Sequence, residues 1–358
     1  MQFKKIEYME WAKTKADLKI NLCRSGVPDL ALKDLRLNLD DLEINSEYSY
    51  GYPPLKEAIA ARYGVKEENV VTTIGTSQGL FYVCATLLER GDKVLVEEPA
   101  YEPLLAVPRL FGAHILRLER KFENKYQIDW EGFESLVASN IKLVILTNLH
   151  NPSGALLPRS EISKLASLAQ KKGFIVFIDE IYLEFWDGEE SQTAFSCGEN
   201  IVVGSSLTKV YGLPGLRCGW LLTPSSLAEQ MRKLMDYVNV EQVFIGEQIS
   251  AKIFPLLDAI KNKNRPLISQ NSEMVKEFIR EERKLSWVEP AQGVICFPKL
   301  ETRANGDELA RVLREKYETS LVPGRFFERP RHFRLGFAVP SAVLAQGLKN
   351  IKEVLKEF

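Results

Sequence analysis

The sequence predicts an α/β protein built around a mostly parallel, doubly wound sheet. Runs rich in Val and Ile alternate with helical patterns, and strands that alternate with helices favour parallel pairing. One such run, 143–147, is continuously apolar, as expected for a strand buried on both faces. The other predicted strands are 70–74, 93–96, 174–178, 201–204 and 219–222. From about residue 227 the pattern changes to long amphipathic helices, and a smaller α+β lobe follows.

Length and composition narrow the possible classes of function. A chain of 358 residues suggests about two lobes. A net charge of -1 gives no electrostatic footprint for nucleic acid or a membrane surface. No apolar run reaches the length of a membrane helix, and the first residues lack the apolar core of a signal peptide. The five cysteines form no CxxC pair, and the three histidines form no cluster. We therefore expect no metal and a cytoplasmic location.

The segment 205–219 combines a lysine with small, hydroxyl and glycine residues. A lysine amine attacks carbonyls well only when burial or neighbouring charge lowers its pKa. Arg217, eight residues after Lys209, and the Ser206 hydroxyl are suited to gripping a phosphate. The alternative is a surface loop with a solvated lysine.

This segment resembles the cofactor-lysine segment of the class I/II aminotransferases, the fold-type I, aspartate aminotransferase-like enzymes that use pyridoxal 5'-phosphate (PLP). The resemblance extends from about Gly26 to Phe337. It implies that Lys209 forms a Schiff base with PLP and that Ser206 and Arg217 bind its phosphate. On this basis we expect a large PLP-binding domain at 41–265 and a small domain formed by 1–40 and 266–358.

Two further segments match the family's cofactor contacts. Strand 70–74 runs into a glycine turn and a helix start, where free N–H groups bind anions, and the resemblance implies that Ser77 and Gln78 donate to the phosphate. After strand 93–96, Tyr101 occupies the position of the aromatic residue that stacks on the pyridine ring. Ordinary half-buried packing is the alternative for Tyr101.

Three residues at strand ends match the groups that hold the cofactor ring. The resemblance implies that Asn151 and Tyr182 bond the phenolic oxygen of PLP, and that Asn151 also lies at the substrate. An acid that ends an apolar strand needs a cationic partner, and Asp179 matches the aspartate that keeps the ring nitrogen protonated. A helix N-cap is the alternative for Asp179.

The C-terminal segment matches the family's substrate clamp. Arg334 stands in an Arg-Leu-x-Phe element and fits the arginine that binds the substrate α-carboxylate, although spacing alone also allows Arg329 or Arg331. The resemblance places Gly26 beside the substrate, and a plain turn is equally compatible. Arg24 and Arg325 are the candidates for binding a second carboxylate.

The segment before Gly51 matches one that crosses the subunit boundary in the family. There a tyrosine reaches the partner's phosphate site, and Tyr50 is our preferred match, with Tyr48 as the alternative. The loop before Gly51 is shorter than in the family, and Lys56 replaces an arginine. The resemblance implies a homodimer with shared active sites.

The ordered set of motifs predicts a transferase of amino acid metabolism. We expect Lys209 to move the proton while an amino group passes from an L-α-amino acid to a 2-oxo acid, with 2-oxoglutarate as the expected acceptor. A PLP-dependent lyase or cyclase on the same fold is the alternative. A nucleotide-binding module without catalysis would need a Gly-x-Gly-x-x-Gly turn or a P-loop, and neither is present.

Overall fold

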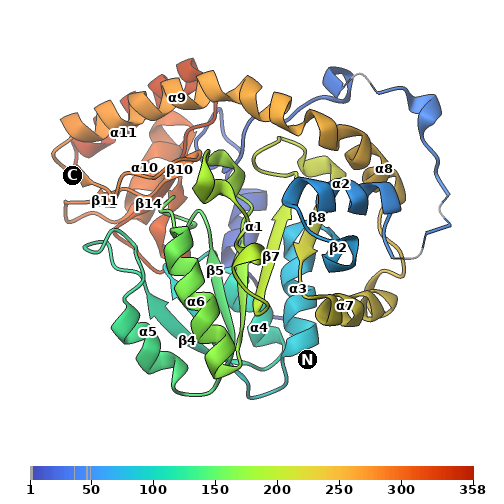
Figure 1. The fold of residues 1–358 in the computed structure, drawn as a ribbon. Helices are drawn as coiled ribbons and strands as arrows, with labels where there is room; N and C mark the ends of the chain where they lie inside the picture. Colours follow the sequence, from blue (N-terminus) through green and yellow to red (C-terminus); the bar gives the residue numbers. More distant parts are fainter. Residues whose placement is uncertain (1–2, 36, 46, 49) are drawn as a thin grey trace.

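A seven-stranded sheet forms the centre of the computed structural model, which describes residues 3–35, 37–45, 47–48 and 50–358 (Figure 1). The strand order is β2-β8-β7-β6-β5-β3-β4. All neighbours are parallel except β8, which runs antiparallel to both β2 and β7. The prediction of a mostly parallel α/β sheet is confirmed. The strands are β2 (Val70–Ile74), β3 (Lys93–Glu98), β4 (His114–Glu119), β5 (Ile141–Thr147), β6 (Ile175–Asp179), β7 (Ile201–Ser206) and β8 (Cys218–Leu222).

Helices cover both faces of this sheet, which is why its central strands are apolar on both sides. In β5, Val144 and Leu146 pack into one apolar cluster, while Leu143 and Ile145 pack into another on the opposite face. The first cluster includes side chains of α2 (Pro53–Tyr63), α5 (Trp130–Val137), α6 (Arg159–Lys172) and α8 (Phe244–Ile253). The second includes α3 (Gly75–Leu87), α4 (Pro103–Leu110) and α7 (Ser225–Val238).

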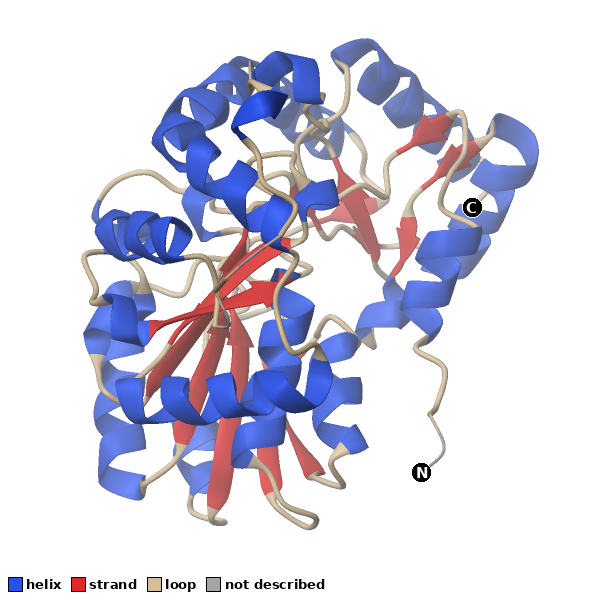
Figure 2. Cartoon of the chain, turned by 90° about the vertical axis from the view of Figure 1, so that its right-hand side faces the viewer, coloured by secondary structure: helices blue, strands red, loops and turns tan. Residues whose placement is uncertain are grey.

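The C-terminal part forms a second group of short strands and helices beside the sheet (Figure 2). The 25-residue helix α9 (Leu257–Glu281) leads into it. Strands β10 (Ile295–Cys296), β14 (Phe333–Gly336) and β13 (Val322–Pro323) pair antiparallel, as do β9 (Leu285–Ser286) and β11 (Lys299–Leu300). Helices α10 (Gly306–Tyr317) and α11 (Ser341–Leu355) complete this group.

The N-terminal segment lies against this C-terminal group. Strand β1 (Ile20–Asn21) pairs in parallel with β12 (Thr319–Ser320), and helix α1 (Glu7–Thr14) precedes it. This arrangement agrees with joining the N-terminal residues to the C-terminal lobe, and the boundaries 41–265, 1–40 and 266–358 stay a prediction. None of the helices in the described ranges is long and apolar enough to cross a membrane.

We predict that Gly336→Ala is strongly destabilising, because backbone fills the space beside this residue. A Cβ there would lie 1.7 Å from the Arg24 carbonyl oxygen, and Gly336 N donates to Leu22 O at 2.8 Å. Relief of the clash must move β14 away from the N-terminal segment, at a loss of at least about 2 kcal/mol in the free energy of unfolding. Chemical denaturation measures it. The control is Gly215→Ala, whose Cβ would meet no atom within 4 Å. Equal stability of the two variants would contradict the prediction.

Candidate active site

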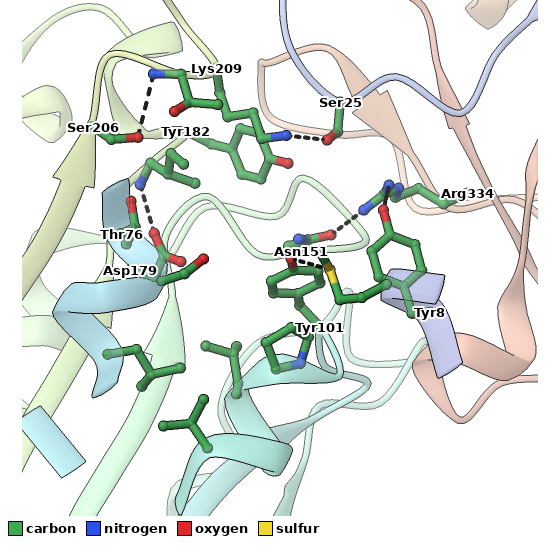
Figure 3. Close-up of a pocket in the computed structure, with 18 of the residues that line it drawn as sticks. Tyr8, Ser25, Thr76, Tyr101, Asn151, Asp179, Tyr182, Ser206, Lys209 and Arg334 are labelled. Atoms are coloured by element: carbon green, nitrogen blue, oxygen red, sulfur yellow. Dashed lines mark hydrogen bonds between the residues drawn. The ribbon is translucent and has the colours of Figure 1, made fainter. Parts of the chain in front are cut away.

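The predicted cofactor residues meet at the carboxyl ends of the parallel strands. The segments after β3, β5, β6 and β7 carry Tyr101, Asn151, Tyr182 and Lys209, and all four side chains line one pocket with Asp179 (Figure 3). Parallel strands present their carboxyl ends at one edge of a sheet, and ligands bind there in open α/β folds. Helix α1 and strand β14 supply the other walls, through Tyr8, Met9 and Arg334.

Lys209 is held against the loop at 22–30 by its backbone and its side chain. Val27 N donates to Lys209 O at 2.9 Å, and a Cβ on Gly26 would lie 3.0 Å from that same oxygen. The structure therefore explains why a glycine stands at position 26. The Lys209 amine points into the pocket and donates to Ser25 Oγ at 2.9 Å.

The electrostatics of the pocket favour a reactive amine. Burial and, to a smaller extent, the nearby Arg334 guanidinium lower the pKa of Lys209 to about 8, while Asp179 acts in the opposite direction. A group with this pKa is partly neutral near pH 7, which is what a nucleophile and a proton carrier both need.

Asp179 and Tyr182 are buried beside this amine. Burial raises the pKa of Asp179 to about 7, against a hydrogen bond from Ile181 N to Oδ1 at 3.0 Å. An ionised carboxylate in such a site needs a cation. Burial likewise raises the pKa of Tyr182 to about 12, so its phenol keeps its proton across the physiological range.

The opposite end of the pocket is suited to a phosphate. Helix α3 begins there at Gly75, and Thr76, Ser77, Ser206 and Arg217 line the pocket. A Cβ on Gly75 would lie 2.6 Å from Arg217 Nη2, so only glycine lets the guanidinium lie over the helix start. Helix N-termini and arginine both favour anions. Ser77 and Arg217 are exposed, which leaves this end open to solvent.

Gln78 is not brought to the pocket wall. Its Oε1 accepts from Ile74 N at 2.7 Å and its Nε2 donates to Asn239 Oδ1 at 3.3 Å. Gln78 directly follows Ser77 on helix α3, and its side chain points away from the pocket. The side chain of Gln78 therefore does not support the predicted contact with a phosphate, and that contact stays a prediction. Thr76, which we did not predict, lines the pocket instead, and its buried hydroxyl lacks a hydrogen-bond partner.

Arg334 is 1% exposed and lies opposite Lys209. Its Nη1 donates to Asn151 Oδ1 at 3.0 Å and its Nη2 donates to the Tyr8 hydroxyl at 2.8 Å, while Nε is buried without a partner. The other two arginines that spacing allowed lie outside the pocket. Arg329 pairs with Glu98 at 2.5 Å, and Arg331 donates to Leu300 O at 3.0 Å.

The candidates for a second carboxylate are also outside this pocket. Arg24 pairs with Asp29 at 2.6 Å, and Arg325 pairs with Asp307 at 2.5 Å. Both side chains are nearly half exposed and neither lines the pocket. Their predicted contact with a second carboxylate is therefore not supported by this geometry.

The two tyrosines before Gly51 lie on the surface. Tyr50 is 40% exposed and donates to Asp236 Oδ2 at 3.1 Å, and Tyr48 packs edge-on against Tyr52. Neither lines the pocket of its own chain. Both positions are compatible with a contact to another subunit, and this role stays a prediction.

Sequence reasoning missed Tyr8, Met9 and Ser25. Nothing in the sequence pattern around Tyr8 indicates that this segment folds back over the pocket. Its position depends on Glu102, whose carboxylate accepts from Glu7 N and Tyr8 N at 3.1 and 2.7 Å. Ser25 had a signal, because it directly precedes a glycine already expected beside the substrate.

A comparison with known protein families identifies the family of the chain. The family model described as "Aminotransferase class I and II" matches residues 13–351. The chain belongs to this family. The curated relatives of this aminotransferase include capreomycidine synthase of Streptomyces vinaceus, which is 28% identical over 94% of this chain and 90% of that protein.

Solved structures of two kinds resemble this aminotransferase. A PLP-dependent aminotransferase from Streptococcus suis superposes with a TM-score of 0.94 at 25% identity, covering 100% of this chain and 99% of that one. A PLP-dependent cyclase, OrfR, gives a TM-score of 0.91 at 25% identity, covering 100% and 98%. The family implies PLP as cofactor.

The residues of the pocket fit this cofactor. The phosphate end provides a helix N-terminus, Arg217 and the unpartnered hydroxyl of Thr76. The other end provides a buried carboxyl, Asp179, which a pyridinium would neutralise, and an amine with a lowered pKa, Lys209. Among the described residues no group of three or more His, Cys, Asp and Glu side chains could hold a metal ion.

We predict that Asp179→Asn stabilises the cofactor-free protein at pH 8. The folded-state pKa of Asp179 is raised from 3.8 to about 7, so the folded protein disfavours the ionised form of this carboxyl. The protein therefore loses stability as the pH rises from 3.8 to about 7. Asparagine keeps the oxygen that accepts from Ile181 N and removes the charge. Denaturation at pH 8 should show a gain of up to about 4 kcal/mol in the free energy of unfolding, with a much smaller gain at pH 4. An unchanged or lower stability at pH 8 would refute this.

Proposed function

We propose that this protein transfers an amino group from an L-α-amino acid to a 2-oxo acid with PLP as cofactor. The observation that carries the proposal is one pocket with three distinct groups: an amine of lowered pKa at Lys209, a buried carboxyl at Asp179 and a buried guanidinium at Arg334. Transamination needs a group for each of three tasks, which are moving a proton, holding the cofactor ring and binding a carboxylate.

The roles follow from the chemistry of each group. PLP, when bound, supplies an electron sink for the pair left at the substrate Cα. Arg334 binds the α-carboxylate with two parallel hydrogen bonds, and Asn151 orients that guanidinium through the contact at 3.0 Å. Lys209 Nζ takes the Cα proton and returns a proton to the cofactor side. Asp179 holds the ring nitrogen.

The remaining cofactor contacts are assigned to side chains around the pocket. Tyr182 and Asn151 hold the phenolic oxygen, Tyr101 covers the ring, and Lys209 holds the cofactor covalently between turnovers. Thr76, Ser77, Ser206 and Arg217 hold the phosphate. Tyr8 closes the side opposite Lys209 (Figure 3).

We propose 2-oxoglutarate as the acceptor, on the basis of the family resemblance. Among the described residues of this pocket, the cationic side chains are Lys209, Arg217 and Arg334, and all three already have other roles. A cation for a second carboxylate would have to come from another subunit or from a rearrangement of Arg24 or Arg325. A cytoplasmic location likewise stays a prediction.

A lyase or cyclase on the same site is the second candidate. It is favoured by the likeness to a PLP-dependent cyclase along the whole chain and by the similarity to a protein named capreomycidine synthase. Such an enzyme would use the same Lys209, Asp179 and Arg334. It would differ in eliminating a group from the substrate side chain, or in closing a ring with it. The fate of the amino group separates the two candidates.

We further propose a homodimer with shared active sites. The phosphate end of the pocket is open, with Ser77 and Arg217 exposed. A group of exposed apolar side chains lies in the segment 44–50 and around the end of α7. They are Ile44, Tyr48, Tyr50, Tyr237, Val238, Val240, Val243 and Ile245. A second copy would cover this surface and bring Tyr50 to the open phosphate end.

The amino group transfer is tested with a panel of L-α-amino acids and 2-oxo acids. We expect a new amino acid to form from the 2-oxo acid in equimolar amount with the keto acid derived from the donor, measured by mass spectrometry. Lys209→Ala should lower kcat by at least about 10³-fold, because both proton steps lose their base. Release of ammonia, or a cyclised product without an acceptor, would favour the second candidate. Near-normal turnover of Lys209→Ala would exclude both.

The shared site is tested by mixing two inactive variants. If Tyr50 acts in the partner's site, a mixture of Lys209→Ala and Tyr50→Phe chains forms heterodimers with one intact site. Random reassortment after refolding should restore about a quarter of the wild-type activity, because half the dimers are mixed. The same mixture with Tyr48→Phe tests the other tyrosine. A monomer in sedimentation at micromolar concentration would contradict the proposal.

A further inference from the structure

The Ser25 hydroxyl lies between two groups of the active site. It accepts a hydrogen bond from Lys209 Nζ at 2.9 Å, and its proximity acts to lower the pKa of the Tyr182 phenol against the larger, opposite effect of burial. In the part of the chain that the structure describes, Lys209 Nζ is the one hydrogen-bond partner of this hydroxyl. A role in folding the loop therefore does not account for a hydroxyl at this position.

The backbone around Ser25 fixes the hydroxyl where it is. Val27 N donates to Lys209 O at 2.9 Å, and Leu30 N donates to Gly212 O at 2.8 Å. Gly26 packs directly on the Lys209 backbone, where a Cβ would lie 3.1 Å from Cα. The loop is thus joined to the lysine segment directly after Ser25, and Ser25 is 8% exposed.

The surroundings explain why such a partner is needed. The free Lys209 amine faces a second cation across the pocket, Arg334, and burial disfavours its protonated form. An uncharged acceptor stabilises an ammonium group without adding a negative charge beside the substrate carboxylate. Asp179 is the only carboxylate among the largest electrostatic contributors to Lys209, and its proposed role is at the cofactor ring.

We propose that Ser25 is a positioning residue that holds the Lys209 amine, oriented and able to take up a proton, whenever that amine is not bound to the cofactor. The inference rests on the proposed role of Lys209. The Ser25 oxygen accepts one Nζ hydrogen and thereby fixes the direction in which the amine points into the pocket. Ser25 carries no proton itself in any step.

The groups that face Lys209 must be considered together in any pH experiment. These groups come from four parts of the chain. Among them, Ser25 is the residue that bonds the amine through an uncharged hydroxyl. The titratable and charged members are Asp179 at the end of β6, Tyr182 after it, Arg334 on β14, Arg24 in the loop at 22–30 and Arg217 before β8.

The first test measures the protonation of Lys209 in the cofactor-free full chain. Trace labelling with acetic anhydride between pH 6 and 10 reports the neutral fraction of each amine, with exposed Lys66 as reference. Loss of the acceptor in Ser25→Ala removes stabilisation of the ammonium form, so the midpoint for Lys209 should fall by about one pH unit. At pH 7.5 the labelling rate should rise about threefold.

Three variants separate this role from a structural one. Ser25→Thr keeps the hydroxyl and should keep the midpoint, and Ser25→Cys keeps the size with a weaker acceptor and should shift it partway. Ser320→Ala is the matched control, because it deletes a buried hydroxyl that bonds Ala16 O at 2.7 Å without touching Lys209. It should lower the melting temperature and leave the labelling midpoint unchanged.

The second test uses the holoenzyme. Ser25→Ala should lower kcat about tenfold with less than a twofold change in KM, because Ser25 acts on the amine and not on the substrate carboxylate. An unchanged labelling midpoint or an unchanged kcat in Ser25→Ala would overturn the inference. Failure of the proposed function has a different signature, since Lys209→Ala would then keep its turnover whatever Ser25→Ala does.

Discussion

Burial of the Arg334 guanidinium is the constraint on which the arrangement of the site depends. A charged group removed from water is tolerated only when its donors find acceptors. The acceptors come from three segments far apart in the chain: Tyr8 in α1, Cys23 O in the N-terminal loop and Asn151 after β5. The Phe327 ring lies 5.0 Å from the guanidinium carbon. One side chain thereby joins the central sheet, the N-terminal segment and the C-terminal strands.

A buried charge pair supports Asn151 from behind. Arg120 Nη1 and Glu97 Oε2 are 2.6 Å apart, and both side chains are fully buried. Thr147 donates to Glu97 Oε1 at 2.5 Å and accepts from Asn151 N at 2.9 Å. The turn that carries Asn151 is therefore held by a hydrogen-bonded network from β3 and β5. Breaking such a network at one member leaves an uncompensated charge, which explains why a polar cluster persists inside an apolar sheet.

The site contains groups that are not optimised for stability. Burial disfavours the charged forms of Lys209 and Asp179, with pKa values near 8 and 7. Both pKa shifts destabilise the cofactor-free protein near neutral pH. A bound cofactor with a phosphate and a ring nitrogen would offset this loss of stability. The exposed phosphate end and the apolar surface around Tyr237 are the parts that the proposed second subunit would cover.

The sequence by itself determined six of the seven strands and several residues of the pocket, because these depend on local patterns, whereas the edge strand β4 was not among the predicted strands. Apolar runs such as 143–147 predict buried strands, and residues that directly follow parallel strands must share one edge of the sheet. Asp179, Tyr182 and Lys209 could therefore be found from their order along the chain. Only the tertiary structure decided which way Gln78 points, which arginines face the pocket, and that Tyr8 and Ser25 belong to it. Those facts depend on contacts between segments up to about 300 residues apart, such as Tyr8 with Arg334. No local pattern encodes them, because each is set by packing and by the pairing of buried charge.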